Sequence, residues 1–219
     1  MSDSSNADPP WLEAAIALSL SVAALTTTWS TYQAALWDGE QAANYSLANG
    51  LRIEASRSAA RADILEAVDV ELFSSWLDAK AGGATELQAF YYERFRPDFR
   101  LAFDAWGALK PLENPDAPQG PFMMEEYGLP ERAKAAALEA KAQATFDQGE
   151  RDNDIGDVYV QATVILASAL FFGGICQTFK RGRVRMALAS LSMAACVVGV
   201  IRTLTLPAIP PAFMWGLLG

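Results

Sequence analysis

Three long apolar runs stand out along the chain, separated by polar segments. The first covers residues 11–31 and holds one charge, Glu13, while the second covers 158–179 and holds none. The third covers 186–206 and holds only Arg202, near its end. About 20 apolar residues in a helix cross about 30 Å of hydrocarbon, so each run predicts a transmembrane helix.

The first run has a defined start. Asp8 precedes Pro9 and Pro10, which predicts an N-cap followed by proline in the first helical turn. A cleavable signal peptide is the alternative interpretation of such a run. The chain lacks a positively charged segment before the run, and residues 26–33 (TTTWSTYQ) make a poor cleavage site. We therefore expect a retained membrane helix.

A short basic segment at residues 180–185 separates the second and third runs. This segment predicts a cytoplasmic turn between two antiparallel helices, because cytoplasmic loops are enriched in Lys and Arg. We expect its side chains to set the topology and contact anionic lipid headgroups; a specific lipid or regulatory site is the alternative. The cations are Lys180, Arg181, Arg183 and Arg185.

The rest of the topology follows by counting crossings from this turn. The N-terminal tail 1–10 is expected in the cytoplasm, and the polar segment 32–157 on the outer side with the apolar C-terminal tail 207–219. We expect a multi-pass protein of a bacterial inner membrane, with segment 32–157 in the periplasm. The lipid bilayer is then its first partner.

Segment 32–157 has the pattern of a long helical hairpin. The helical composition continues past the first apolar run to Ala79, and Pro130 opens a second long helix that leads into the second run. Small and apolar residues repeat every three or four positions on both, which predicts antiparallel, coiled-coil-like packing. The first stripe is Leu47, Leu51, Ala55, Ser58, Ala62, Leu65, Asp69, Leu72 and Trp76; the second is Ala133, Ala137, Ala140 and Ala144.

An aromatic segment lies between the two long helices. Gly82 and Gly83 end the first helix, and Thr85 with Gln88 predicts a capping box for the next one. Pro97 predicts a break between two short helices. We expect the aromatic side chains to pack as a core with Phe73 and Trp76, although an apolar ligand site is the alternative. They are Phe90, Tyr91, Phe95, Phe99, Phe103 and Trp106.

Composition removes several classes of chemistry. The chain has no histidine, which excludes Ser-His-Asp and Cys-His catalysis and imidazole-ligated metals. A net charge of −9 with one basic cluster argues against nucleic acid as a partner. Cys176 and Cys196 lie in apolar runs and are expected as buried hydrophobic side chains. No catalytic, cofactor-binding or metal-binding residue is assigned, and no cofactor is expected.

Polar side chains within the apolar runs are the candidate functional residues. Thr26, Thr27, Thr28, Ser30 and Gln33 give the outer end of the first helix a polar side, and with Gln161 and Thr163 they are candidates to line a solute pathway. Bonding of the hydroxyls to carbonyls of their own helix is the alternative, and the residue types favour it. Arg202 is costly in a membrane and predicts a partner or a function, with snorkelling to the headgroups as the alternative. Its candidate partners are Asp38, Asp154 and Asp157.

The acidic segment ERDNDIGD at residues 150–157 has a second interpretation. Asp152, Asp154 and Asp157 faintly resemble a calcium loop, but their spacing does not match the EF-hand pattern. We expect a solvated acidic turn next to the membrane.

Two segments carry a resemblance to a known group of proteins. They are WSTYQAALWDGEQ at residues 29–41 and YVQATVILASALFFGG at 159–174, the latter followed by the basic turn. The chain resembles a family of uncharacterised bacterial inner-membrane proteins of the domain-of-unknown-function type, with three spans and a helical insert. The resemblance implies membrane location and an all-α fold, and it brings no catalytic residues.

These features together favour a non-enzymatic membrane protein. We expect a scaffold, accessory or sensing subunit that acts through segment 32–157, as a homo-oligomer or within a larger membrane complex. The alternative is an oligomeric channel or transporter for an ion or small solute. An enzyme of lipid or envelope chemistry has the least support from the residues.

Overall fold

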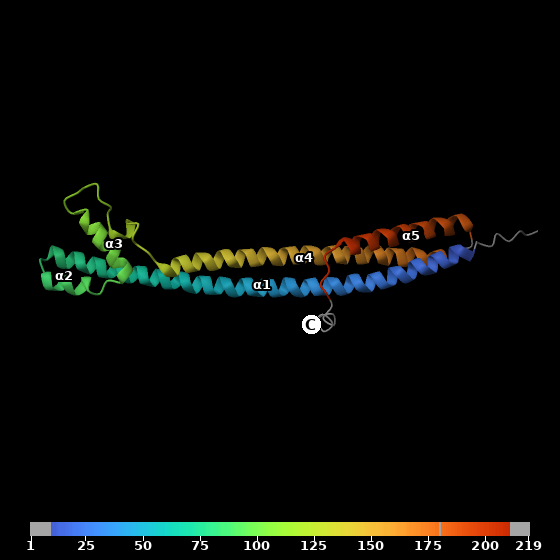
Figure 1. The fold of residues 1–219 in the computed structure, drawn as a ribbon, viewed down its shortest axis with the longest axis horizontal. Helices are drawn as coiled ribbons and strands as arrows, with labels where there is room; N and C mark the ends of the chain where they lie inside the picture. The colour runs from blue at the N-terminus through green and yellow to red at the C-terminus, as the bar shows by residue number, and fades with distance from the viewer. Residues whose placement is uncertain (1–9, 180, 211–219) are drawn as a thin grey trace, which may run out of the picture. The chain divides into compact units, whose positions relative to one another are not determined.

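The chain folds into helices joined by short turns and one longer loop (Figure 1). The computed structural model describes residues 10–179 and 181–210, and these ranges contain no strand. The helices are α1 (Pro10–Ala81), α2 (Thr85–Tyr92), α3 (Pro97–Ala108), the 3-10 helix η1 (Pro121–Met123), α4 (Pro130–Cys176) and α5 (Gly182–Thr205). The predicted all-α class is therefore confirmed for this part of the chain.

The three predicted apolar runs all lie in helices that are long and apolar enough to cross a membrane. The first run lies in α1; the second lies in α4 up to its end at Cys176, and the third lies in α5 up to its end at Thr205. The chain divides into two compact units, which we describe separately. The terminal unit comprises Met1–Ser46 and Thr145–Gly219, and the central unit comprises Leu47–Ala144. Helices α1 and α4 each contribute to both units.

Glycines bring the helices of the terminal unit close together. A Cβ added to Gly173 on α4 would lie 2.5 Å from Leu20 Cδ2 on α1 and 2.8 Å from Ser192 Oγ on α5. One added to Gly199 on α5 would lie 2.6 Å from Leu166 Cδ2 on α4. Small residues at helix contacts allow such approach where lipid supplies no hydrophobic drive for association. Glycine at these two positions therefore permits the close approach of α4 to α1 and α5.

Large apolar side chains face outward from the terminal unit. On a protein surrounded by water such side chains are normally buried, but in a bilayer the lipid tails solvate them. Their distribution over all three long helices is typical of a membrane-embedded bundle. The most exposed include Leu18, Leu25, Val164, Phe171, Ile201 and Leu204.

In the central unit, α1 contacts the first turns of α4 through ion pairs at its edges. Arg132 Nη2 lies 2.8 Å from Asp63 Oδ1 and 2.7 Å from Glu66 Oε2. Lys134 Nζ lies 3.5 Å from Glu54 Oε1. These are exposed pairs, so each contributes little to stability. They nevertheless mark the sides of the contact, whose centre consists of small side chains.

Almost all side chains of the stripe predicted on α1 are buried or partly buried. Ala48, Leu51, Ala55, Ser58, Ala62 and Asp69 are buried, and Leu65, Leu72 and Trp76 are partly buried. Leu47 is the exception, because its side chain is 54% exposed and Ala48 takes the buried position.

The stripe predicted on α4 is wrong. Ala133, Ala137, Ala140 and Ala144 are all exposed, whereas Ala135 and Ala142 are buried. The period is that of a helix, but the phase is shifted by two residues. Alanine occurs on every side of this segment, so its positions do not distinguish the buried face.

An aromatic core holds α3 against the end of α1 in the central unit. Phe99 is fully buried, and its ring packs edge-on against Phe73 at 6.4 Å and Phe95 at 4.8 Å. The predicted packing with Phe73 and Trp76 is confirmed for four of the six aromatic residues. Phe90 and Tyr91 lie outside this core, and Phe90 is 46% exposed. The buried members of the core are Phe73, Phe95, Phe99, Phe103 and Trp106.

The helix ends around this core differ in part from expectation. Pro97 starts α3, as the predicted break requires. The predicted capping box is wrong, because the N-cap of α2 is Ala84 and no side chain caps it. The backbone closes the turn instead: Ala84 N–H donates to Ala79 O, and Gly83 adopts φ +70°, which glycine tolerates without strain.

Candidate functional site

The first polar cluster lies in the terminal unit, where α1 holds the segment that follows α5. Gln33 on α1 is a fully buried polar side chain. Its Nε2 donates to Ile209 O at 2.9 Å, and its Oε1 accepts from Ile209 N–H at 2.8 Å. One side chain therefore satisfies both backbone groups of a residue that has left the helix. Such groups are expensive to bury unpaired.

A second pair of polar groups joins α1 to α5 at a fully buried position. Ser30 Oγ and Thr203 Oγ1 lie 2.8 Å apart. Thr203 already donates its hydroxyl proton to Gly199 O at 2.9 Å. The Ser30 hydroxyl is therefore the donor to Thr203, and the chain of bonds ends on a helix carbonyl.

Two aromatic side chains complete this polar cluster. Trp37 Nε1–H on α1 and the Tyr159 hydroxyl on α4 both donate to Pro207 O, each at 3.2 Å. Tyr159 is fully buried. A carbonyl oxygen has two lone pairs and accepts both bonds. We call these residues the polar clasp: Ser30, Gln33, Trp37, Tyr159, Thr203, Pro207 and Ile209.

The three threonines predicted to line a pathway bond within their own helix. Thr26, Thr27 and Thr28 donate to Val22 O, Ala23 O and Ala24 O at 2.8, 2.7 and 3.1 Å. This is the alternative that the sequence left open. Of the candidate residues on this polar side of α1, the structure places Ser30 and Gln33 in the polar clasp.

Arg202 lies on the exposed side of α5. None of its candidate partners, Asp38, Asp154 and Asp157, forms an ion pair with it in the described part of the chain. Asp38 lies instead beside Gly156, where an added Cβ would be 3.2 Å from Asp38 Oδ1. The geometry therefore leaves the Arg202 guanidinium for solvent or headgroups.

The turn between α4 and α5 is shorter than the predicted basic turn at residues 180–185. Helix α5 begins at Gly182, so Arg183 and Arg185 lie in its first turn and Arg181 directly precedes it. Arg185 Nη2 lies 3.3 Å from Glu13 Oε1, which ties the start of α5 to the start of α1. Lys180 and the tail residues 1–9 and 211–219 fall outside the described residues.

The acidic segment next to the second apolar run is helical, so the expected turn is wrong. Residues 150–157 lie within α4, and Asp152 is only 2% exposed. Asp152 accepts hydrogen bonds from Asn44 Nδ2 at 2.7 Å and Gln148 Nε2 at 2.8 Å. The carboxylate thus joins α4 to α1 inside the terminal unit. No group of side chains that can hold a metal occurs among the described residues.

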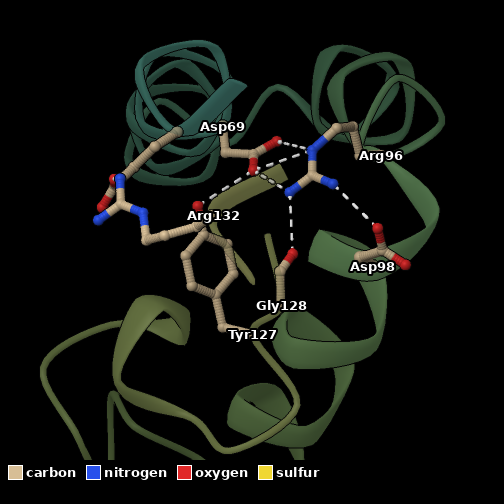
Figure 2. A network of polar contacts seen from close by, with 7 residues as sticks. Asp69, Arg96, Asp98, Tyr127, Gly128 and Arg132 are labelled. Carbon is tan, nitrogen blue, oxygen red and sulfur yellow. Dashed lines mark hydrogen bonds and ion pairs between the residues drawn. The ribbon is translucent and has the colours of Figure 1, made fainter. Parts of the chain in front are cut away.

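The central unit contains a buried ion pair, which Figure 2 shows from close by. Asp69, the one acidic residue on the predicted stripe, is fully buried. Arg96 Nη2 donates to Asp69 Oδ2 at 2.8 Å, and Arg96 Nε lies 3.2 Å from the same oxygen. Arg96 Nη1 reaches Asp98 Oδ2 at 3.0 Å, and Tyr127 donates its hydroxyl to Asp69 Oδ2 at 3.2 Å. We call Asp69, Arg96, Asp98 and Tyr127 the charged network.

The contacts of the charged network keep Arg96 and Tyr127 protonated. The hydrogen bond to Asp69 raises the pKa of the Arg96 guanidinium. Burial and then the charge of Asp69 raise the pKa of Tyr127 to about 12. Both groups therefore stay hydrogen-bond donors to Asp69 at neutral pH, and the network joins α1, the start of α3 and the loop before α4.

The two cysteine thiols are also enclosed. Cys176 and Cys196 are buried and free, as the apolar runs predict, and Cys176 Sγ–H donates to Gly173 O at 3.1 Å. Sequence reasoning missed the partners of the polar clasp and of Asp69, because they are distant along the chain. An isolated polar residue on an apolar stripe was the available signal, and it pointed to Asp69. No family model, curated protein or solved structure matches this chain.

Proposed function

We propose that this chain is a non-enzymatic membrane protein that serves as a scaffold, accessory or sensing subunit in a larger membrane complex. Its three apolar helices anchor it in a bacterial inner membrane as a multi-pass protein. The central unit, a helical hairpin in the periplasm, makes the contacts. The arrangement of the satisfied, enclosed polar groups supports a structural role over a catalytic one.

The proposed orientation is supported by the charges at one end of the terminal unit. Arg181, Arg183 and Arg185 gather where α5 begins, and Arg185 draws Glu13 to the same end. Positive charge collects on the cytoplasmic side of membrane proteins. The polar clasp then lies toward the opposite, periplasmic side.

The observation that carries the proposed function is an unpartnered face of α1 in the central unit. Ile53, Ile64 and Val68 are 55%, 64% and 47% exposed, and Ala60 between them is also exposed. Their spacing places them on one side of the helix, opposite the buried stripe. A helix of a water-soluble region normally carries polar side chains there. We call Ile53, Arg57, Ala60, Ile64 and Val68 the outer face.

The charges on the outer face favour one kind of occupant. Arg57 and Arg61 are exposed and form no ion pair within the described residues. Two parallel copies of this face would bring Arg57 against Arg57, which is unfavourable. We therefore propose an amphipathic helix of a different subunit, with carboxylates beside its apolar stripe.

Site-specific photo-crosslinking in the native membrane tests this function. A photoreactive residue at 53, 60, 64 or 68 is expected to give one discrete adduct with a different protein, and Arg57→Glu is expected to abolish it. The matched control is position 70, since Val70 is 44% exposed on the same helix but lies off the outer face. Equal adducts at 64 and 70, or a monodisperse monomer in mild detergent without adducts, would reject the proposal.

The proposed topology has its own test. A cysteine placed at Asp116, in the long loop of the central unit, is expected to react with a membrane-impermeant maleimide in intact cells whose outer membrane has been permeabilised. A cysteine in place of Arg183 is expected to react only after the inner membrane is opened. Labelling of both positions from the same side would overturn the topology.

The geometry gives the channel alternative less support. The hydroxyls of Thr26, Thr27 and Thr28 are bonded to their own helix, and Gln33 is occupied by the backbone of Ile209. No observation in the terminal unit therefore favours a pathway built from these residues.

A further inference from the structure

A cleft opens beside the aromatic core of the central unit. It has a volume of about 330 Å³, near the lower limit for pockets that bind small ligands. The end of α1 lines one side, and the end of α3 with the residues after it lines the other. The lining residues that the argument uses are Trp76, Lys80, Phe103, Trp106, Lys110 and Glu113.

The floor of the cleft consists mostly of aromatic ring surface. Trp76 and Phe103 pack edge to face at 4.8 Å, and both belong to the aromatic core. Trp106 lies beside them, and its Nε1–H is already donated to Pro118 O at 2.8 Å. This floor therefore suits an apolar or aromatic group, which gains from burial against rings.

The rim of the cleft carries two cations from different elements. Lys80 Nζ lies 4.9 Å from the centre of the Trp76 ring, which holds the ammonium beside the floor. Lys110 stands directly after α3, and its ammonium is 4.0 Å from Glu113 Oε2. Lys110 and Glu113 are 75% and 77% exposed, so this pair is weak and easily exchanged for another carboxylate.

The backbone of Lys110 marks this position as unusual. Its φ is +50°, and it is the only residue other than glycine with a positive φ in the described part of the chain. The position just after a helix favours glycine, because a side chain there is strained. A lysine therefore occupies a place where glycine is energetically better, and such outliers are found preferentially at functional sites.

From the aromatic floor and the two lysines on the rim, we propose that this cleft binds the C-terminal carboxylate of a polypeptide whose last residue is apolar or aromatic. The terminal side chain packs against Trp106 and Phe103, and the carboxylate lies between Lys80 and Lys110. The small volume suits one residue and its neighbour better than a long acyl chain. The inference rests on the proposed function in that it treats the central unit as the partner-binding part.

Calorimetric titration of the full chain in detergent tests the proposal. The probe is acetyl-Ala-Ala-Phe with a free C-terminal carboxylate, compared with the same peptide as its amide and with octanoate. We expect saturable binding of the acid, at least about tenfold weaker binding of the amide, and no tighter binding of octanoate. Equal binding of acid and amide overturns the carboxylate assignment, and tighter binding of octanoate assigns the cleft to fatty acids instead.

Lys110→Gly is the decisive variant, because it removes the charge while relieving the backbone. Its melting temperature is expected to equal or exceed that of the wild type, and its affinity for the peptide acid to fall about tenfold. Lys80→Gln is expected to weaken binding similarly. Lys134→Gln is the matched control, since Lys134 pairs with Glu54 away from the cleft. Unchanged affinity in Lys110→Gly, or no binding of the acid to the wild type, overturns the inference.

These results are separable from the test of the outer face. Ile64 does not line the cleft, so Ile64→Glu is expected to leave the affinity for the peptide acid unchanged. Loss of peptide binding with intact crosslinks at position 64 would reject the cleft alone. Intact peptide binding without crosslinks would reject the outer face alone.

Discussion

The two units of this chain share two long helices, but each unit packs a further helix against them by different means. In the terminal unit, glycines and alanines allow backbones to approach, and hydrogen bonds such as that of Ser30 with Thr203 join the helices. In the central unit, large rings and one buried ion pair join α3 to α1. This difference is what we expect if lipid surrounds the terminal unit and water surrounds the central unit, as we propose. Burying rings is rewarded in water, whereas lipid tails reward only tight fit and satisfied polar groups.

The buried ion pair should give the largest effect when broken. Asp69→Ala leaves Arg96 without its main partner in a mostly buried position, and should lower the stability of the central unit by about 3 kcal/mol. Hydrogen exchange of the α3 amides measures this loss. Asp98→Ala is the control and should cost under about 1 kcal/mol, because Asp98 is 46% exposed. Equal losses of stability in the two variants would show that the buried pair of Asp69 and Arg96 contributes no more than the exposed contact of Arg96 with Asp98.

The close approach in the terminal unit should give the next largest effect. Gly173→Ala places a Cβ against Leu20 and Ser192 and should cost about 1–2 kcal/mol, seen as a lower melting temperature in detergent. Gly174→Ala is the matched control on the next residue, where nothing lies within 4 Å of the new Cβ. It should stabilise the helix slightly, since alanine is the better helix former. Similar behaviour of the two variants would contradict the packing described above.

Alkaline pH should sharpen the comparison, because the charged network belongs to the central unit alone. The pKa of Tyr127 is about 12 in the folded chain, against an ordinary value of 10.0. The unfolded chain loses this proton first, so the contribution to stability is full below pH 10 and is lost as the pH rises toward 12. The expected loss is about 1–2 kcal/mol. In Tyr127→Phe, the protection of the α3 amides from hydrogen exchange should fall less between about pH 10 and about pH 12 than in the wild type. An equal fall in both proteins would contradict the role given to Tyr127.

The polar clasp should give the smallest effect on stability. Gln33→Leu leaves both backbone groups of Ile209 without this partner and should cost about 1 kcal/mol, since Ile209 is only half-buried and water can replace part of the lost bonding. The Ile209 amide should lose its protection from hydrogen exchange. Gln161→Leu on exposed surface of α4 is the control and should leave that amide protected.

Local pattern was sufficient to predict most of the helices. Apolar runs and helical spacing predicted α1, α4 and α5, and Pro97 predicted the start of α3, because these features depend on neighbours in sequence. The wrong stripe on α4 shows the limit of that approach. Alanines at 133 and 135 are chemically identical, and only the partner helix determines which one is buried.

The site residues were harder to predict than the helices. Gln33 and Thr26 belong to the same polar segment, yet one bonds a residue 176 positions away and the other bonds its own helix. Asp152 was expected in solvent, but Asn44 supplies its partner from α1. In each case the decisive neighbour comes from another helix, so no local spacing contains the information.

The way Gln33 holds Ile209 has a consequence for how this part of the sequence can change. Its amide contacts main-chain atoms, so substitution of the Ile209 side chain leaves the two bonds available. Proline is the exception, because it has no N–H to donate. Proline already occupies positions 207 and 210, on either side of the short stretch that includes Ile209. We therefore expect related chains to carry many different residues at position 209, but not proline.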